Sequence, residues 1–208
     1  MSIRVVFWDL GGVLLRTHDW GGRKQWELRL GLAPGELERR VFDGPTAQRA
    51  ALGQADESHI WSDLAQSFGL TDGERDRLAA DFFAGDRVDY DLVAYIRSLR
   101  PRRKTGVISN AWPEIRGLLE HEWHIADAFD ALVISAETGL AKPDPAIYRL
   151  ALDRVQAEPS QAVFVDDFEA NLESARALGM QTVLFRAPGQ ARADVERILN
   201  AGAAASIE

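Results

Sequence analysis

Short apolar runs recur along the chain and predict five buried strands. Each run is four or five residues long and mainly apolar, without the apolar–polar alternation that marks a half-exposed strand. Unbroken runs of this kind are typical of parallel sheets, whose strands are covered on both faces. The runs occupy residues 5–8, 105–109, 131–135, 162–165 and 181–185.

Helical patterns separate most of these strands. Apolar positions recur at helical spacing in residues 92–99, 115–119 and 172–178. Pro113 suits the first turn of the second segment, and Gly179 suits the end of the third. Because strands that alternate with helices form βαβ units, the sequence predicts an α/β fold. Its core is expected to be a doubly wound, Rossmann-like parallel sheet with helices on both faces.

Residues 16–85 interrupt this alternation. They contain no convincing strand, but apolar side chains share one helical face in residues 60–68, and Thr71 with Glu74 matches a capping box. We therefore expect a small α-helical domain at 16–85, inserted into a sheet domain that comprises residues 1–15 and 86–200. Residues 201–208 are expected to form a disordered tail.

The composition is that of an ordinary globular protein, with 46% hydrophobic and 27% charged residues. A formal net charge of −8 argues against nucleic acid or an anionic membrane as a partner. No apolar stretch is long enough for a membrane span, and the first apolar run is too short for a signal peptide. The chain has no cysteine, which excludes disulfides and thiolate chemistry. We expect a cytoplasmic protein that is a monomer or a weak homodimer.

Acidic residues directly follow two of the predicted strands. Asp9 follows the first run and precedes a Gly-Gly pair, which permits a sharp turn and a close approach of the backbone to a ligand. A plain strand-ending turn is the alternative at this position. Asp166 and Asp167 follow the fourth run, where two adjacent acids repel each other unless a divalent cation neutralises them. The carboxyl ends of parallel strands, where such sheets bind ligands, are thus expected to be acidic.

Other polar residues are expected at the same edge. Ser109 and Asn110 end the second run, where a hydroxyl and an amide could bind an oxyanion or could cap the next helix. Lys142 precedes a proline that disfavours helical geometry at the lysine, and the following Asp-Pro pair suits the start of a helix. Taken alone, Lys142 could also be an ordinary surface lysine. Together, these residues predict one polar site at the edge of the sheet.

This set of motifs resembles the haloacid dehalogenase (HAD) superfamily of hydrolases over nearly the whole chain. The four motifs are Phe-Trp-Asp-Leu-Gly-Gly-Val-Leu at 7–14, Val-Ile-Ser-Asn at 107–110, Lys-Pro-Asp-Pro at 142–145 and Phe-Val-Asp-Asp-Phe-Glu-Ala-Asn at 164–171. The helical insertion resembles the family's C1-type cap, and the Asp-Leu-Gly-Gly start resembles a phosphatase-like branch. The resemblance implies a Mg²⁺-dependent phosphatase that hydrolyses small phosphorylated metabolites through an aspartyl-phosphate intermediate.

The resemblance also implies a nucleophile and a metal site. Asp9 would attack the phosphoryl group. Mg²⁺ would be held by Asp9, the backbone carbonyl of Gly11 and Asp167, a small set of oxygen ligands of the kind this ion prefers. Asp166 would act through water or from just outside the coordination sphere.

The same resemblance assigns the phosphate-binding residues. Ser109, Asn110 and Lys142 would bind the oxygens of the transferring phosphoryl group. Lys142 would also balance the acids, because three carboxylates carry about −3 against +2 from Mg²⁺ and +1 from the lysine.

One position departs from the family's pattern. Phosphatases of this superfamily usually carry a second Asp two residues after the nucleophile, which protonates the leaving alcohol and later activates water; here that residue is Gly11. A general acid or base contributes about 10²–10⁴-fold in rate. His18 or Asp19 could replace it only if the entry to the cap folds back towards the site. The protein could therefore be a slow phosphatase, or a phosphatase in which another group replaces this acid.

Two other interpretations remain. One is a metal-independent 2-haloacid dehalogenase, which uses an aspartate nucleophile without the second Asp. The acid pair Asp166-Asp167 argues against it, because unneutralised acids repel both a haloacid carboxylate and the departing halide. The other is a catalytically weak metal- or phosphate-binding regulatory protein.

The substrate contacts are expected among residues of the cap and of the loop after the second motif. Trp20, Arg23 and Trp112 are the candidates, because tryptophan could stack on a sugar or base and arginine could pair with an anionic group. The alternative is that the tryptophans of the cap pack its own small core. His121 and His124 have the spacing of a helix surface and lack the further ligands that a metal site needs.

Overall fold

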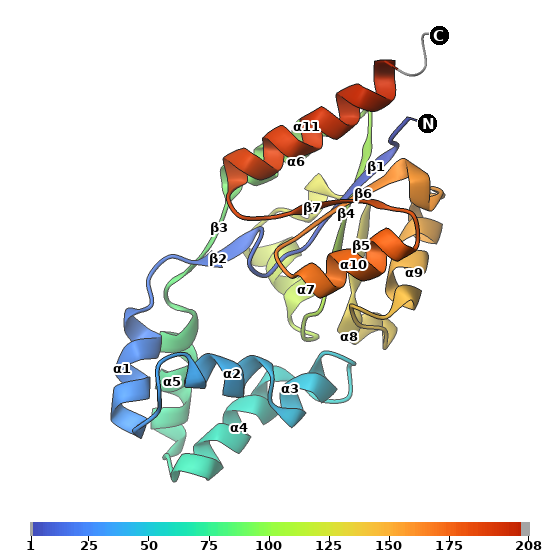
Figure 1. The fold of residues 1–208 in the computed structure, drawn as a ribbon. Coiled ribbons are helices and arrows are strands. Elements are labelled where there is room, and N and C mark those ends of the chain that lie inside the picture. Colours follow the sequence, from blue (N-terminus) through green and yellow to red (C-terminus); the bar gives the residue numbers. More distant parts are fainter. Residues whose placement is uncertain (1, 205–208) are drawn as a thin grey trace.

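A computed structural model describes residues 2–204, and their central element is a five-stranded parallel sheet in the order β5-β4-β1-β6-β7 (Figure 1). Its strands are β1 (Val5–Trp8), β4 (Lys104–Ser109), β5 (Ala131–Ile134), β6 (Ala162–Asp166) and β7 (Gln181–Leu184). Each predicted strand is confirmed to within one residue at either end. The α/β fold class is therefore as predicted.

The register of the sheet brings the ends of its central strands level. Trp8 pairs with Val107 of β4 on one side and with Val165 of β6 on the other. The Asp9 N–H extends this ladder by donating to the Val165 carbonyl at 2.8 Å. Asp9 and Asp166 consequently emerge side by side at the carboxyl edge of the sheet.

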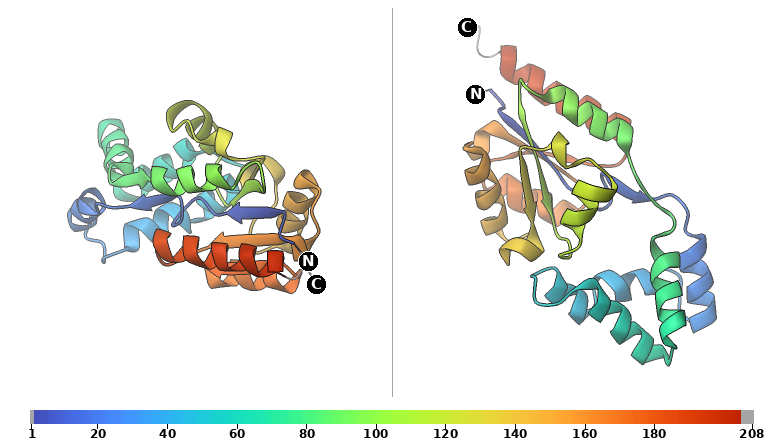
Figure 2. Two further views of the ribbon diagram at one scale, coloured as in Figure 1. Left: turned by 90° about the horizontal axis from the view of Figure 1, so that it is seen from above. Right: turned by 180° about the vertical axis from the view of Figure 1, so that it is seen from behind.

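Helices cover both faces of the sheet (Figures 1 and 2). One face carries α6 (Tyr90–Leu99) and α11 (Pro188–Ala204), and the other carries α9 (Pro145–Val155) and α10 (Glu169–Ala177). Successive side chains of a strand point to opposite faces, so Val6 and Trp8 pack in the first hydrophobic core and Val5 and Phe7 in the second. The apolar face predicted for residues 92–99 is buried in α6.

Shorter segments connect these elements. They are α7 (Ile115–Gly117), the π-helical η1 (Leu118–Glu122), the 3₁₀ turns η2 (Ala126–Ala128) and η3 (Pro159–Gln161), and α8 (Ser135–Thr138). The helix predicted at 115–119 is thus a single α turn that widens into a π turn, and of its apolar side chains only Leu119 is fully buried. The predicted end of α10 is confirmed, because Gly179 adopts a φ of +98° just beyond it.

The inserted residues fold as five helices with a hydrophobic core of their own. These are α1 (Gly21–Leu30), α2 (Glu36–Phe42), α3 (Pro45–Ala50), α4 (Glu57–Phe68) and α5 (Asp72–Phe83). Trp26, Trp61 and Phe82 are buried in this core, and the predicted capping box of Thr71 and Glu74 starts α5. The helical module, as we call α1–α5, faces the carboxyl edge of the sheet (Figure 1).

A two-stranded antiparallel ribbon joins the module to the sheet domain. It consists of β2 (Leu15–Thr17) and β3 (Asp86–Val88). The Thr17 hydroxyl donates to Asp86 at 2.6 Å, and Arg16 pairs with Asp89 at 2.6 Å. The sequence did not predict these strands, because three-residue strands with half-buried side chains leave no periodic pattern.

The last helix extends further than expected. Residues 201–204, which were predicted to belong to a disordered tail, continue α11 as helix. Three of these four residues are alanine, the residue with the highest helix propensity. The remainder of the predicted tail, 205–208, lies outside the described residues. Among residues 2–204, no helix has the length and apolar character needed to cross a membrane.

Candidate active site

The Asp9 carboxylate lies at the carboxyl edge of the sheet, directly after β1. Its Oδ1 accepts a hydrogen bond from the Leu10 N–H at 2.7 Å and lies 2.8 Å from the Lys142 ammonium. Burial raises the pKa of the Asp9 carboxyl from 3.8 to about 7; the Lys142 charge opposes this shift, and the Asp166 charge adds to it. Both contacts engage Oδ1 and leave Oδ2 as the oxygen available to a ligand.

Lys142 bridges two acids from different strands. Its Nζ lies 2.8 Å from Asp9 and 2.7 Å from Asp166, and its side chain is only 2% exposed. The ammonium also lies 5.3 Å from the centre of the Phe164 ring, a cation–π distance. The predicted alternative of a surface lysine is thereby ruled out, and Lys142 is the buried counter-charge of the acid cluster.

Asp166 is fully buried and held from three sides. Besides Lys142, its carboxylate accepts from the Phe168 N–H at 2.8 Å and from the Asn171 amide at 3.1 Å. The Tyr148 hydroxyl donates to the Asn171 carbonyl at 2.9 Å and fixes that part of α10. Asn171 belongs to the fourth motif but was not singled out from the sequence, because nothing local indicates that its side chain points back to Asp166.

Asp167 depends on a glycine in the loop after β1. A Cβ on Gly12 would lie 2.0 Å from Oδ2 of Asp167, and Gly12 also has a φ of +76°. Asp167 is exposed as a residue, but partial burial of its carboxyl, and then the charge of Asp166, raise the pKa of Asp167. Gly12 therefore leaves the space that the second acid of the pair occupies.

The three acids could hold a divalent cation. Carboxylate oxygens of Asp9, Asp166 and Asp167 all lie within 4.8 Å of one another. Their charge of about −3, with +1 from Lys142, leaves about −2, which a divalent cation neutralises. Hard oxygen donors in this number suit Mg²⁺ or Ca²⁺, so the chemistry of the site fits the expected metal. Gly11, whose carbonyl is the further predicted ligand, lies exposed in the same loop.

Ser109 and Asn110 reach the same edge at the end of β4. Ser109 is the last residue of the strand and is buried. The Asn110 side chain exchanges two hydrogen bonds with the backbone of Lys142: its amide donates to the Lys142 carbonyl at 2.8 Å, and its Oδ1 accepts from the Lys142 N–H at 2.7 Å. Asn110 thus places Lys142, and the sequence could not indicate this because the two residues are 32 positions apart.

Trp112 lies where the helical module meets the sheet domain. Its ring is 5.7 Å from that of Phe42 at the end of α2 and 6.3 Å from that of Phe83 at the end of α5. Trp20 is 41% exposed. Of the three expected substrate contacts, Trp112 is thus the one that lies at the boundary between the helical module and the sheet domain, just after the second motif.

Arg23 has partners within the protein for its guanidinium group. It donates to the Phe82 carbonyl at 3.0 Å, to Glu38 at 3.0 Å and to Asp86 at 2.9 Å, and it stacks 4.1 Å from the Phe82 ring centre. These contacts tie α1, α2, α5 and β3 together. Because the side chain is buried and engaged by three partners, it stabilises the module and does not face a substrate.

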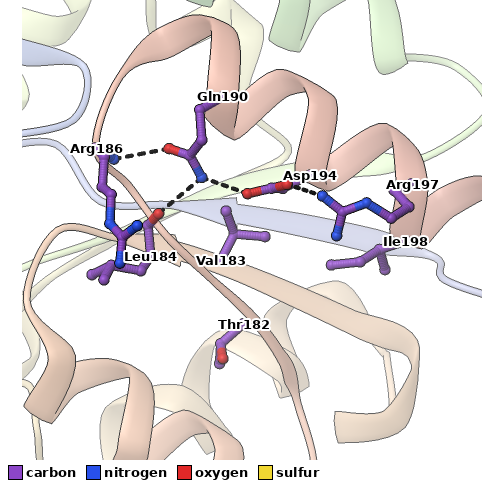
Figure 3. A pocket seen from close by; sticks show the side chains of 8 residues that line it. All are labelled: Thr182, Val183, Leu184, Arg186, Gln190, Asp194, Arg197 and Ile198. Carbon is purple, nitrogen blue, oxygen red and sulfur yellow. Dashed lines mark hydrogen bonds and ion pairs between the residues drawn. The ribbon is translucent and has the colours of Figure 1, made fainter.

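A separate cavity of about 230 Å³ lies on the outer side of β7 (Figure 3). Gln190 accepts from the Arg186 N–H at 3.0 Å and donates to the Leu184 carbonyl at 3.1 Å and to Asp194, which in turn pairs with Arg197. Gln190 and Asp194 therefore have their partners within the lining of this cavity. None of the expected site residues lines it.

The chain belongs to the haloacid dehalogenase-like hydrolase family, whose profile matches residues 3–179. The fold and this match define the protein as an enzyme of the hydrolase class. Phosphatase MT3486 of Mycobacterium tuberculosis is 31% identical over 208 residues, which cover 96% of this chain and 95% of that protein.

Other relatives are longer proteins. Bifunctional epoxide hydrolase 2 of Rattus norvegicus is 28% identical over 216 residues, which cover 95% of this chain and 39% of the relative. Acyl-CoA dehydrogenase family member 10 of Mus musculus is 41% identical over 217 residues, with 95% of this chain and 19% of the relative covered. The chain thus spans well under half of the length of these two proteins.

Solved structures share the fold. A HAD family enzyme of Bacteroides thetaiotaomicron, crystallised with magnesium and inorganic phosphate, superposes with a TM-score of 0.73 at 19% identity over 89% of this chain and 96% of its own. L-2-haloacid dehalogenase of Xanthobacter autotrophicus superposes with a TM-score of 0.62 at 21% identity over 88% of this chain and 77% of its own. At these identities the likeness concerns the fold alone, and both kinds of enzyme have it.

Proposed function

We propose that the protein is a Mg²⁺-dependent phosphatase of small phosphorylated metabolites and that Asp9 is its nucleophile. The observation that carries the proposal is the cluster of Asp9, Asp166 and Asp167 around the buried Lys142 ammonium. The name of the mycobacterial relative, a phosphatase that matches over nearly its whole length, supports the same reaction class.

The reaction is proposed to proceed in two steps. Asp9 Oδ2, the oxygen that Leu10 and Lys142 leave open, attacks phosphorus and forms an aspartyl-phosphate; water then hydrolyses this mixed anhydride and restores the carboxylate. The attacking and leaving oxygens lie roughly in line through phosphorus. The leaving group therefore faces away from β1, towards the helical module.

Ser109 and Lys142 are proposed to bind the phosphoryl oxygens. Ser109 ends β4, the strand next to β1, and the Lys142 ammonium lies 2.8 Å from Asp9, where it would supply positive charge to the attacked group. Because the side chain of Asn110 is engaged by the Lys142 backbone, we propose that Asn110 contributes through its own backbone N–H and by positioning the lysine.

Asp9, Asp167 and the Gly11 carbonyl are proposed to hold Mg²⁺, with Asp166 linked through water. The ion would neutralise charge on the phosphate and on the acids. In its absence the acids repel an approaching phosphate dianion, so binding of substrate requires this neutralisation.

The helical module is proposed to act as a C1-type cap comprising residues 16–85. It faces the carboxyl edge of the sheet (Figure 1). The two parts meet through the rings of Trp112, Phe42 and Phe83. Trp112 is the proposed aromatic contact to the leaving group. The exposed Trp20 lies beyond the far end of the ribbon and is proposed to contact only a more distant part of a substrate.

Hydrolysis of p-nitrophenyl phosphate tests this proposal, measured with Mg²⁺, with EDTA and with Asp9→Asn. Turnover that requires both Mg²⁺ and Asp9 supports it. Absence of turnover in the wild type, or equal turnover by Asp9→Asn, contradicts it. Release of chloride from 2-chloropropionate in EDTA would instead indicate a dehalogenase.

A further inference from the structure

The proton inventory of the site suggests which leaving group the enzyme handles. If the proposed function is correct, the leaving oxygen must depart either as an anion or with a proton from a nearby donor. Among the described residues, the titratable side chains at the carboxyl edge other than Asp167 have a partner or lie elsewhere, and Asp167 is a proposed Mg²⁺ ligand, which requires it as the carboxylate.

The acids and the lysine of the cluster lie on the nucleophile's side. Lys142 is 2% exposed and lies between Asp9 and Asp166, beneath the attacked phosphorus. Asp166 is fully buried and holds three hydrogen-bond donors. These groups cannot reach an oxygen that leaves in the opposite direction.

The loop after β1 carries no proton donor on its ligand side. Leu10 is apolar, and Gly11 and Gly12 have no side chain. A Cβ at Gly11 would have no atom within 4 Å, whereas one at Gly12 would strike Asp167. Position 11 is thus an open place at the rim of the site that a side chain could occupy without a clash.

The next titratable residues along this loop are carried away by the ribbon. Leu15 is bridged to Gly11, and β2 then extends outward, so that His18 lies about 10 Å further on at 3.3 Å per residue. The His18 N–H donates to the Gly85 carbonyl at the far end of the ribbon, and the Asp19 carboxylate accepts from the Gly21 N–H at 2.8 Å. Neither residue takes the place of a proton donor at position 11.

The other loops of this edge give the same result for the described residues. After β4, Glu114 accepts from the Glu57 N–H of α4 at 3.3 Å. Before α9, Asp144 caps the helix, and after β6, Glu169 pairs with Arg176. The ring contacts of the helical module with Trp112 come from Phe42 and Phe83, and Glu57 of the module accepts from the Trp61 indole N–H at 2.8 Å.

We propose that the leaving group departs unprotonated, and that the substrate is therefore a phosphate carried on an acidic oxygen, namely an acyl phosphate. A carboxylate leaving group has a pKa of about 4 and a phenol about 10, whereas an alkyl alcohol resembles water at about 15.7. Of these leaving groups, only the carboxylate is stable as an anion at neutral pH. The inference rests on the proposed phosphatase function and narrows it to this substrate class.

Both steps balance without an added acid. Asp9 forms a bond to phosphorus while the bond from phosphorus to the leaving oxygen breaks, and the electron pair leaves with a carboxylate anion. Water then attacks the aspartyl-phosphate; the bond from phosphorus to Asp9 breaks, and both protons of the water remain on the released dihydrogen phosphate. The Asp9 carboxylate is regenerated unchanged.

A leaving-group series tests the proposal. We would measure kcat/KM by phosphate release for acetyl phosphate, for phenyl phosphates of graded phenol pKa and for glycerol phosphate, with Mg²⁺ and after subtraction of uncatalysed hydrolysis. The expected result is that kcat/KM falls steeply as the leaving-group pKa rises. A general acid would flatten this dependence, so kcat/KM for glycerol phosphate should be about 10²–10⁴-fold lower than an enzyme with such an acid would show. A flat dependence on leaving-group pKa overturns the proposal.

Variants at position 11 test whether the absence of an acid there causes the steep dependence of kcat/KM on leaving-group pKa. Gly11→Asp is expected to flatten the slope by raising turnover of glycerol phosphate, and Gly11→Ala, which adds bulk without an acid, is expected to keep the steep slope whatever its overall rate. An unchanged slope in a folded Gly11→Asp variant contradicts the assignment. The wild-type slope alone decides the main claim if a variant does not fold.

The same data separate this inference from the proposed function. Phosphate release that depends on Asp9 but not on leaving-group pKa overturns the inference and leaves the phosphatase intact. If no substrate of the series shows release that depends on Asp9, both fail.

Discussion

The Asn110 side chain and the Lys142 backbone form a reciprocal pair of hydrogen bonds, 2.8 and 2.7 Å long. This pair joins the end of β4 to the loop before α9 and thereby determines where the lysine enters the acid cluster. The relationship explains how a lysine on a loop can be as well placed as a residue on a strand.

Replacement of Asn110 by alanine is expected to misplace Lys142. Because a displacement of about 1 Å near reacting groups can cost about 10²-fold in rate, kcat should fall by about that factor, with a smaller change in KM. Steady-state kinetics on p-nitrophenyl phosphate measure both. Asn200→Ala, on the exposed side of α11, is the matched control and should retain wild-type kinetics. Wild-type kcat in Asn110→Ala would show that the pair does not position the lysine.

Gly12→Ala is expected to displace Asp167 and to weaken Mg²⁺ binding about 10–100-fold, as losses around a metal site typically do. Titration calorimetry with Mg²⁺ measures the affinity without substrate. Gly31→Ala is the control: Gly31 has a similar positive φ of +68° but no neighbour within 4 Å. Both variants should lose stability through backbone strain; an equal Mg²⁺ affinity in both would refute the contact with Asp167.

Asp167→Ala removes a proposed ligand and should lower Mg²⁺ affinity at least tenfold. The neighbouring acid Glu169 pairs with Arg176 outside the cluster, so Glu169→Ala provides a charge-matched comparison. Calorimetry at one pH and ionic strength compares the two variants directly. A similar loss in both would mean that general charge, and not coordination, attracts the ion.

Asp56 is expected to make α4 sensitive to acid. It caps the helix, and hydrogen bonds from Ser58 and then from His59 lower its pKa from 3.8 to about 2. Because the folded state favours the charged form, this contribution to stability is complete above pH 3.8 and is lost as the pH falls through 2.

Thermal melts of the wild type and of Asp56→Asn between pH 7 and pH 3 test this effect. Asparagine keeps the capping oxygen but does not titrate. The wild type should have the higher melting temperature at pH 5–7, and the difference in melting temperature between the two proteins should narrow below pH 4. A difference that widens in acid would contradict the direction of the pKa shift.

The strands and the positions of the acids could be predicted because they depend on local sequence. An apolar run such as residues 162–165 identifies a buried strand, and parallel strands bring Asp9 and Asp166 to one edge whatever the details of packing. Caps such as that of Asp144 are likewise decided within a few residues.

The remaining features depend on pairs that are distant in sequence. The sequence makes Arg23 a candidate anion-binding residue. Its partner Asp86 lies 63 positions away, and in the folded protein the pair is a buried structural contact. The contact between Gly12 and Asp167 also forms only when β1 and β6 lie side by side. No pattern along a single chain carries this information without the folded sheet.

The covalent step at Asp9 is tested most directly by trapping the phosphorylated enzyme. Wild type and Asp9→Asn would be mixed with Mg²⁺ and ³²P-labelled acetyl phosphate, quenched in acid within the first turnover, and digested to locate the label. We predict label on the peptide that contains Asp9, released by hydroxylamine as expected of an acyl phosphate, and none in Asp9→Asn. Label on another residue, or undiminished phosphate release by Asp9→Asn, would contradict the assignment of Asp9 as the nucleophile.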